Sequence, residues 1–280
     1  MTAVALGLAS SLAWGFADFF GGLQSRKHPL LAVIFMTQAA GLVMVAVAAA
    51  VRGDAPPAAG AWIAWAAAGG LSGIIGLVAF YRGLATGNMG VVAPISSAAA
   101  IVPLTVGLAS GERPTAVQAV GVVLAIAGVA VASYNHDGPV TGGGRVATGA
   151  GLAIVAALGF GGFFVAADRA AEADALYAIV VGRIASVSVL CIAVAVTRTP
   201  LARGRVIPKL ALIGFLDTGA NLLFALASTQ GLVSVVAVLG SVYPVVTVIL
   251  ARVVLGERLH ALQRVGAAGA LIGAAVISVG

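Results

Sequence analysis

The chain has 280 residues, of which 61% are hydrophobic and 9% are charged, and its formal net charge is +6. Soluble domains contain about 25% charged residues, so this composition excludes a water-soluble fold and predicts an all-α polytopic membrane protein. The positive residues lie between the apolar runs, where they bear on orientation in the bilayer, and nucleic acid is not an expected partner.

Ten apolar runs are long enough to be transmembrane helices, because a span needs about 20 mostly apolar residues to cross about 30 Å of hydrocarbon. The first run carries Asp18 and follows no basic segment, so we expect a retained span rather than a cleaved signal peptide. The predicted spans are 3–23, 30–51, 61–85, 91–110, 115–133, 146–167, 175–197, 207–228, 233–254 and 261–279.

The chain contains an internal duplication. Residues 7–20 read GLASSLAWGFADFF and residues 151–164 read GLAIVAALGFGGFF, with shared Gly, Leu, Ala, Ala, Gly, Phe, Phe and Phe. A second pair of matching segments is Gly111-Glu112-Arg113 and Gly256-Glu257-Arg258. Internal repeats must be identified before a fold is inferred, and these predict two copies of one unit.

The predicted repeats are residues 1–133 and 146–280, joined by a linker at 134–145 that contains three consecutive glycines. Each repeat has five spans, an odd number, so the second copy must enter the membrane from the opposite side. Inverted repeats of this kind surround a central cavity and bind substrate near the middle of the bilayer. The duplication therefore predicts transport by alternating access.

Lysine and arginine are unequally distributed between the two sets of predicted loops. The loops after the odd-numbered spans carry Arg26, Lys27, Arg145, Arg198, Arg203, Arg205, Lys209, Arg258 and Arg264. The loops after the even-numbered spans carry Arg52, Arg113 and Arg169. By the positive-inside rule the first set is expected in the cytoplasm and both chain termini outside.

Two features of the predicted spans concern helix packing. The fifth and tenth spans carry small residues at helical spacing, which predicts close helix contact within a scaffold or, alternatively, a homodimer interface. These residues are Gly121, Ala125, Gly128, Ala132, Gly266, Ala270 and Gly273. Pro94, Pro103 and Pro244 are predicted to kink their helices, either as static bends or as hinges.

Charged residues within spans are functional candidates because a charge in the bilayer costs several kcal/mol without a partner or a cavity. Depth along the helices pairs Asp18 with Arg82 and Arg183 with Asp217. Each pair either holds helices together or contributes a carboxylate that binds a substrate ammonium or a proton. Asp217 is the stronger candidate because it is nearest the middle and stands one turn before Asn221.

Aromatic and polar side chains complete the candidate substrate site. Aromatic rings suit an aromatic or cationic ligand through stacking and cation–π contacts, although rings in spans also serve packing. Gln38 and Ser97 add weaker polar candidates. The predicted substrate-binding residues are Trp14, Asp18, Tyr81, Ser96, Phe160, Asp217, Asn221 and Tyr243.

Several chemistries lack the residues that they need. The single cysteine, Cys191, cannot form a disulfide or a thiolate metal site within one chain, and no metal or cofactor is expected. No phosphate-binding Gly-x-x-x-x-Gly-Lys-Ser/Thr motif occurs, so ATP is not expected to drive a cycle. Gly70-Leu71-Ser72-Gly73 resembles a protease nucleophile motif, but all three histidines lie in predicted loops and supply no base, so we do not expect an enzyme.

The ten spans, the duplicated segments in spans 1 and 6 and the Gly-Glu-Arg turns together resemble the EamA type of the drug/metabolite transporter superfamily. The nearest subgroup is similar to aromatic amino-acid exporters. The resemblance implies a cavity lined by spans 1, 3, 4, 6, 8 and 9. Small four-span relatives that expel cations use a glutamate in span 1, where this chain offers only Asp18.

The expected function is export of small metabolites, with amino acids, including aromatic ones, as the favoured class. Export would cross a bacterial-type inner membrane by alternating access without ATP. A proton-coupled exporter of organic cations or drugs is the alternative, and a non-transporting membrane scaffold is a third possibility. The expected partners are a small-molecule substrate and membrane lipid, with the chain as a monomer or a homodimer.

Overall fold

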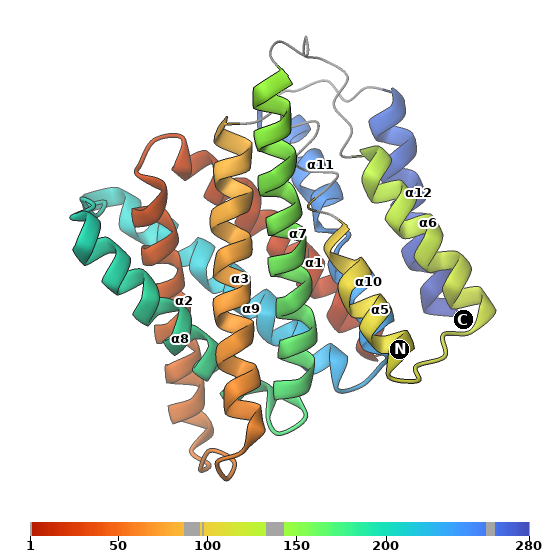
Figure 1. The fold of residues 1–280 in the computed structure, drawn as a ribbon, viewed down its shortest axis with the longest axis horizontal. Coiled ribbons are helices and arrows are strands. Elements are labelled where there is room, and N and C mark those ends of the chain that lie inside the picture. Colours follow the sequence, from red (N-terminus) through yellow and green to blue (C-terminus); the bar gives the residue numbers. More distant parts are fainter. Residues whose placement is uncertain (1, 87–95, 97, 133–142, 256–260, 280) are drawn as a thin grey trace.

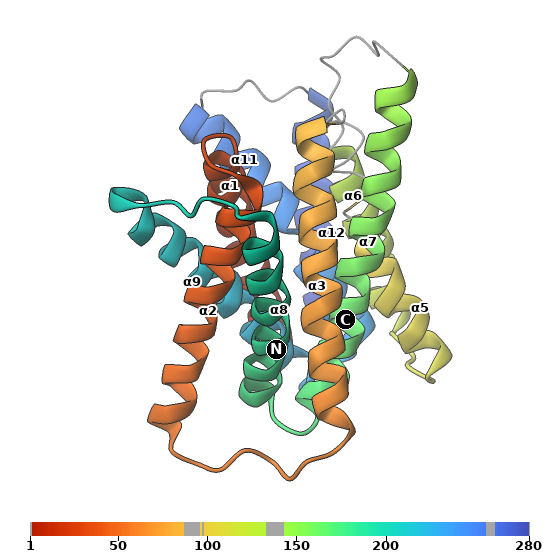
Figure 2. The same ribbon diagram turned by 60° about the vertical axis from the view of Figure 1, so that its left-hand side comes forward.

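The computed structural model describes residues 2–86, 96, 98–132, 143–255 and 261–279. All regular elements in these ranges are helices, which confirms the all-α prediction. They are α1 (Thr2–Ser25), α2 (Leu30–Arg52), α3 (Ala61–Thr86), η1 (Ala98–Ala100), α5 (Ile101–Ala109), α6 (Ala116–Ala132), α7 (Gly143–Ala171), α8 (Ala175–Thr197), η2 (Gly204–Val206), α9 (Ile207–Ser228), α10 (Val233–Gly240), α11 (Tyr243–Leu255) and α12 (Ala261–Val279). Figures 1 and 2 both place the two chain ends close to one another.

Six helices in the described ranges are long and apolar enough to cross a membrane: α1, α2, α3, α7, α8 and α9. Shorter apolar helices cover Ala98–Ala109, Ala116–Val131, Val233–Thr247 and Arg264–Ile277. These four fall on the remaining predicted spans. The chain is thus a multi-helix membrane fold, and the ten-span topology remains a prediction.

The ninth predicted span is broken into α10 and α11, which corrects the expected kink at Pro244. The backbone turns at Ser241 and Val242, and Pro244 is the second residue of α11. Proline lacks an N–H and clashes with the preceding turn, but it fits the first turn of a helix. Pro103 likewise lies in the first turn of α5, after η1. Pro94 lies outside the described residues.

The helices around the centre form two packing groups. Group A consists of α1, α2, α9, α10 and α11, and group B consists of α3, η1, α5, α7 and α8. Within group A, α9 packs along α1 and α2, and within group B, α3 packs along α7 and α8. The contacts between groups are chiefly those of α2 with α8 and of α10 with α5. Each group therefore combines helices from both halves of the sequence.

Glycines set the closest helix approaches near the centre. A Cβ on Gly70 of α3 would overlap the backbone of Gly182 on α8, and a Cβ on Gly214 of α9 would overlap the backbone of Thr37 on α2. In lipid, helices associate through such close packing rather than through the hydrophobic effect. These contacts fix α8 and α9 against their neighbours at the level of the cavity.

The helices α6 and α12 pack on each other beside the two groups, at the right of Figure 1. A Cβ on Gly128 would overlap the backbone of Ala270, and one on Gly273 would overlap the backbone of Ala125. The predicted small-residue faces therefore meet within one chain. This arrangement matches the scaffold interpretation and leaves those faces covered.

A charged cluster links the groups where α2 ends and α8 begins. The Arg52 guanidinium contacts the Asp174 carboxylate in bidentate fashion, with Nη2–Oδ2 at 2.8 Å and Nη1–Oδ1 at 3.1 Å, and it also contacts Asp54 at 2.6 Å. Asp174 caps α8 by accepting the Tyr177 backbone N–H at 2.9 Å, and the Tyr177 hydroxyl donates to the Asp54 carbonyl. This cluster pins α2 to α8 at one end of the bundle.

The pKa of Asp174 reflects this cluster. Burial alone would raise the pKa of the carboxyl, but hydrogen bonds from Arg52 and Tyr177 outweigh burial and hold the pKa below its ordinary 3.8. A depressed folded-state pKa stabilises the fold above the unfolded value, and the contribution is lost as pH falls through the folded value.

We expect Gly128→Ala to destabilise the protein by about 1–3 kcal/mol, because the added methyl overlaps the backbone of α12. Gly219→Ala is the matched control: no neighbouring helix comes within 4 Å of the place that its Cβ would take, and alanine in a helix is favoured by about 0.5–1 kcal/mol. Thermal unfolding of both purified variants measures the difference. Equal shifts would contradict the described α6–α12 contact.

We expect Asp174→Asn to lower the melting temperature in detergent at pH 6 by a few degrees, because a partly exposed ion pair contributes about 1 kcal/mol or less. Asparagine can still accept the Tyr177 amide, so the change isolates the charge. The difference from wild type should shrink as pH falls below 3.8 toward the depressed pKa of Asp174 in the folded protein. Glu172→Gln is the control, and a difference that persists in acid would refute the ion-pair contribution.

Candidate functional site

A cavity of about 90 Å³ lies between groups A and B, inside a hollow of about 840 Å³ that includes open solvent. Group A supplies the side chains of Trp14, Asp18, Gln38, Asp217, Asn221 and Tyr243. Group B supplies Arg183 and Ser186 from α8, three phenylalanines from α7 and a run of small residues from α3. The small residues leave the space open, and they are Ala66, Gly69, Gly70 and Gly73.

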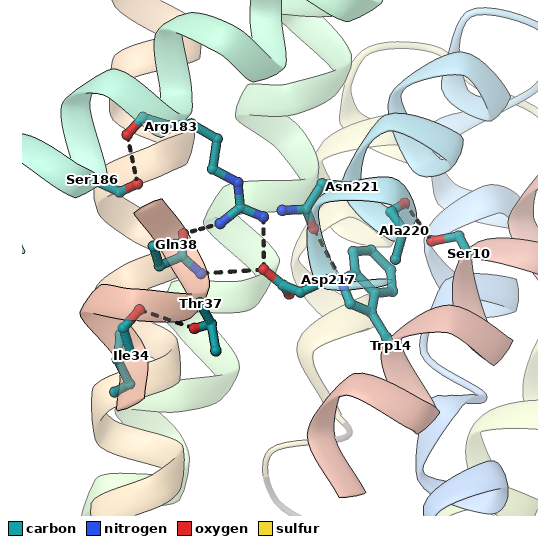
Figure 3. A network of polar contacts seen from close by, with 10 residues as sticks. All are labelled: Ser10, Trp14, Ile34, Thr37, Gln38, Arg183, Ser186, Asp217, Ala220 and Asn221. Carbon is teal, nitrogen blue, oxygen red and sulfur yellow. Dashed lines mark hydrogen bonds and ion pairs between the residues drawn. The ribbon is translucent and has the colours of Figure 1, made fainter. Parts of the chain in front are cut away.

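Arg183 lies at the centre of the polar side of the cavity (Figure 3). Its Nη2 contacts Asp217 Oδ2 at 2.7 Å, and its Nη1 donates to Gln38 Oε1. Gln38 Nε2 in turn donates to Asp217 Oδ2 at 3.2 Å. The arginine comes from group B and both partners come from group A, so this triad joins the groups inside the apolar part of the protein. The predicted Arg183–Asp217 pair is present, and a role in substrate binding stays a prediction.

The triad satisfies charges that water cannot reach freely. The side chain of Arg183 is 6% exposed and that of Asp217 is 20% exposed. Removing one partner of a buried pair leaves the other charge uncompensated and costs about 3–5 kcal/mol. Removing the charge of Arg183 or of Asp217 alone is therefore expected to be costly, whereas removing both charges together leaves neither one unpaired.

Asp18 lies beside the triad and has a different environment. Its electrostatic neighbours are Asp217 and Tyr81. Tyr243 also lies within reach of its charge. The lining residues thus carry two carboxyl groups and one guanidinium.

The predicted Asp18–Arg82 pair is not among the ion pairs that the structure gives for the described residues, and it stays a prediction. Tyr81 is 8% exposed, whereas the next residue, Arg82, is exposed. Adjacent residues on a helix point in directions about 100° apart, because a turn has about 3.6 residues. Tyr81 and Arg82 therefore point in different directions, and Tyr81 lies near Asp18, which depth alone could not reveal.

The other side of the cavity is a wall of aromatic rings around Trp14. Its ring centroid lies 5.6 Å from that of Phe164, 5.9 Å from Phe224 and 6.2 Å from Phe163. Phe164 and Phe224 stack at 4.7 Å, and Tyr243 meets Trp14 edge to face at 6.5 Å. Trp14 Nε1 donates to Asn221 Oδ1 at 2.9 Å, so its polar atom is satisfied and its ring faces its neighbours.

The remaining predicted residues fall inside or near this site. Phe160 lines the cavity, as do Trp14, Asp18, Asp217, Asn221 and Tyr243. Tyr81 is buried behind the lining against Asp18, and Ser96 is fully buried but is not a lining residue. Ser97 lies outside the described residues. Sequence reasoning undervalued Gln38 and missed Phe163.

A repeat signal could have found Gln38. The offset that separates Gly111 from Gly256 also separates Gln38 from Arg183. These two residues occupy equivalent places in the predicted repeats, and in the structure they hydrogen-bond to each other. The occurrence of a polar residue in one repeat and a charged residue at the equivalent place in the other could therefore have indicated that the two side chains interact.

Two motifs noted in the sequence have structural roles. Ser72 Oγ donates to the Gly159 carbonyl at 2.8 Å, so this hydroxyl joins α3 to α7, which is an ordinary helix–helix contact. Glu112, in the first Gly-Glu-Arg turn, accepts the backbone N–H groups of Val233 at 2.9 Å and Ser234 at 3.2 Å. It thereby caps α10 and ties a group B turn to group A. The second turn, at 256–258, lies outside the described residues.

No group of three or more His, Cys, Asp or Glu side chains in the described part of the chain is arranged to hold a metal ion. The arrangement of charges and rings instead suits an organic molecule that carries a positive group and an apolar body.

Comparison with solved structures supports the fold. A structure described only as "Crystal structure of protein" superposes with a TM-score of 0.81 at 17% sequence identity. The match covers 99% of this chain and 96% of that chain. At this identity the likeness concerns the fold alone. A search of curated proteins found no match to the chain.

Comparison with family models identifies the protein class. The model of the EamA-like transporter family matches residues 1–134 and 147–279, which is nearly the whole chain. Members of this family are membrane transporters of small molecules and not enzymes. The chain is therefore a multi-pass membrane protein that belongs to the EamA-like transporter family.

Proposed function

We propose that the protein exports amino acids, including those with aromatic side chains, across a bacterial inner membrane. The observation that carries this proposal is the division of the cavity into a charged side and an aromatic side. An amino acid has the same division: an ammonium and a carboxylate at one end and an apolar side chain at the other. Asp217 and Asp18 suit the ammonium, and the rings around Trp14 suit the side chain.

Alternating access would arise from motion of group A against group B. Helices at equivalent places in the two predicted repeats lie in different groups. The group A helices α1, α2 and α9 correspond to α7, α8 and α3 of group B, and the α10–α11 pair corresponds to η1 and α5. The contact of α1 with α9 then matches that of α7 with α3, which supports ten spans in two inverted repeats. No ATP site is part of this proposal, and the termini are proposed to lie outside the cell.

A second candidate function is proton-coupled export of organic cations. It is favoured by one observation, namely that Asp18 lines the cavity and forms none of the ion pairs given for the described residues. A carboxyl group in that position suits either a proton or a ligand cation. Under this alternative the triad would be structural and Asp18 would carry the coupling.

Purified protein in liposomes is expected to take up labelled tryptophan and phenylalanine, and threonine more slowly because it lacks a ring to contact Trp14. Asp217→Asn should reduce the initial rate at least about tenfold, because it leaves the Arg183 guanidinium with an unpaired charge. Glu172→Gln, which removes an exposed carboxylate outside the cavity lining, should transport normally. Failure of wild-type protein to move any amino acid would refute the proposal.

The second candidate function predicts a different dependence on Asp18. Asp18→Asn should abolish resistance of cells to toxic organic cations and remove any stimulation of transport by an imposed pH gradient. If amino-acid uptake proceeds without a gradient and resistance is unchanged in Asp18→Asn, proton-coupled cation export is excluded. The residue would then serve ligand binding or the contact with Tyr81.

A further inference from the structure

We propose that Arg183 binds the substrate carboxylate by exchanging its partner Asp217 for the ligand. The inference rests on the proposed amino-acid transport and specifies how both charges of the substrate are recognised. Its starting point is the geometry of the Arg183 contacts, which differs from that of the other arginine that links the two groups.

Arg52 and Arg183 form different kinds of pair. Arg52 presents Nη1 and Nη2 to both oxygens of Asp174, the bidentate arrangement in which guanidinium and carboxylate match best. Arg183 makes one contact to Asp217, through Nη2, and its Nη1 goes to the neutral amide of Gln38. The two terminal nitrogens of Arg183, Nη1 and Nη2, thus contact two different acceptors. A ligand carboxylate would satisfy both N–H groups at once.

The position of Arg183 makes the exchange possible without moving the helix. Arg183, Gln38 and Asp217 all line the cavity, so a ligand in the cavity meets the contacts between them directly. Both contacts that Nη1 and Nη2 make cross from α8 to group A, as Figure 3 shows. A ligand that binds Nη1 and Nη2 would therefore break the direct contacts of Arg183 with group A and connect the two groups through itself.

After the exchange, every charge in the site has a partner of opposite sign only if the ligand is a zwitterion. When Arg183 turns to the ligand carboxylate, Asp217 loses its cation and needs another. The ligand ammonium supplies it, and Asp18, an electrostatic neighbour of Asp217, lines the same cavity. An amine without a carboxylate leaves the triad closed, and an acid without an ammonium leaves Asp217 uncompensated. The triad therefore selects ligands that carry both charges.

The replaced link also connects binding to movement. With the substrate absent, the triad holds α8 to α2 and α9 across the two groups. With the substrate bound, the groups would be connected through the ligand. The guanidinium and the carboxylate could then separate as the groups move, because each would retain a counter-charge.

The test compares three probes on the full-length protein in lipid nanodiscs: phenylalanine, 2-phenylethylamine, which lacks the carboxylate, and 3-phenylpropionate, which lacks the ammonium. Wild-type protein is expected to bind phenylalanine at least about tenfold more tightly than either analogue, the effect of one lost charge-assisted contact. The double variant Arg183→Gln with Asp217→Asn keeps the site neutral and should lose this preference.

A second variant covers the case in which the double variant does not fold. Gln38→Glu places a carboxylate against Nη1 of Arg183, where it competes with the ligand carboxylate. Phenylalanine binding should therefore weaken about tenfold, while 2-phenylethylamine binding does not weaken. Gln118→Glu is the matched control, because Gln118 lies at the start of α6 with Thr115 as its partner. It should leave the binding of all three probes unchanged.

The outcomes separate the inference from the proposed function. If phenylalanine is bound and transported, but its preference over 2-phenylethylamine survives in the double variant or in Gln38→Glu, the role of Arg183 is refuted and amino-acid transport stands. If wild-type protein binds 2-phenylethylamine and not phenylalanine, or binds none of the probes, both are refuted.

Discussion

The guanidinium of Arg183 is the group around which the central packing is arranged. A charge in a membrane helix needs partners, and here the partners come from two helices of the opposite group. The helices reach one another because glycines stand next to the charged positions: Gly182 precedes Arg183 and packs on α3, and Gly214 lies one turn before Asp217 and packs on α2. The close helix contacts and the charge compensation therefore depend on each other.

The cavity combines a repeated framework with chemistry that is not repeated. Gln38 and Arg183 occupy equivalent places in the two halves, and so do the glycine contacts of α3 with α8 and of α9 with α2. The carboxylates have no such equivalents, because Asp18 corresponds to Gly162, and the residues 144 and 145 positions before Asp217 are Gly73 and Ser72. Both acids therefore belong to group A and the guanidinium belongs to group B, so the electrostatic attraction acts between the two groups.

The sequence predicted the helices and most of the site, because apolar runs and isolated charges are strong signals in a membrane protein. The pairing of Arg183 with Asp217 followed from depth along the helices, whereas the pair that the same reasoning predicted for Asp18 and Arg82 is not among the ion pairs given for the described residues. Depth says nothing about the direction in which a side chain points, and adjacent residues such as Tyr81 and Arg82 point in different directions. The break before Pro244 was expected as a bend, since the pattern could not show that two apolar helices meet there. Phe163 was missed because nothing in an apolar run distinguishes a cavity-facing ring from a lipid-facing one.

The hydrogen bond between Trp14 and Asn221 has a consequence for selectivity. The only polar atom of the indole is occupied within group A, so the wall that Trp14 forms with the lining residues Phe163 and Phe164 presents ring faces and edges. Such a surface distinguishes molecules by shape and by how readily they leave water, and very little by the pattern of their hydrogen-bonding groups. The charged side of the cavity would select strictly for the charged groups at one end of a ligand. The aromatic side would accept a range of apolar groups at the other end.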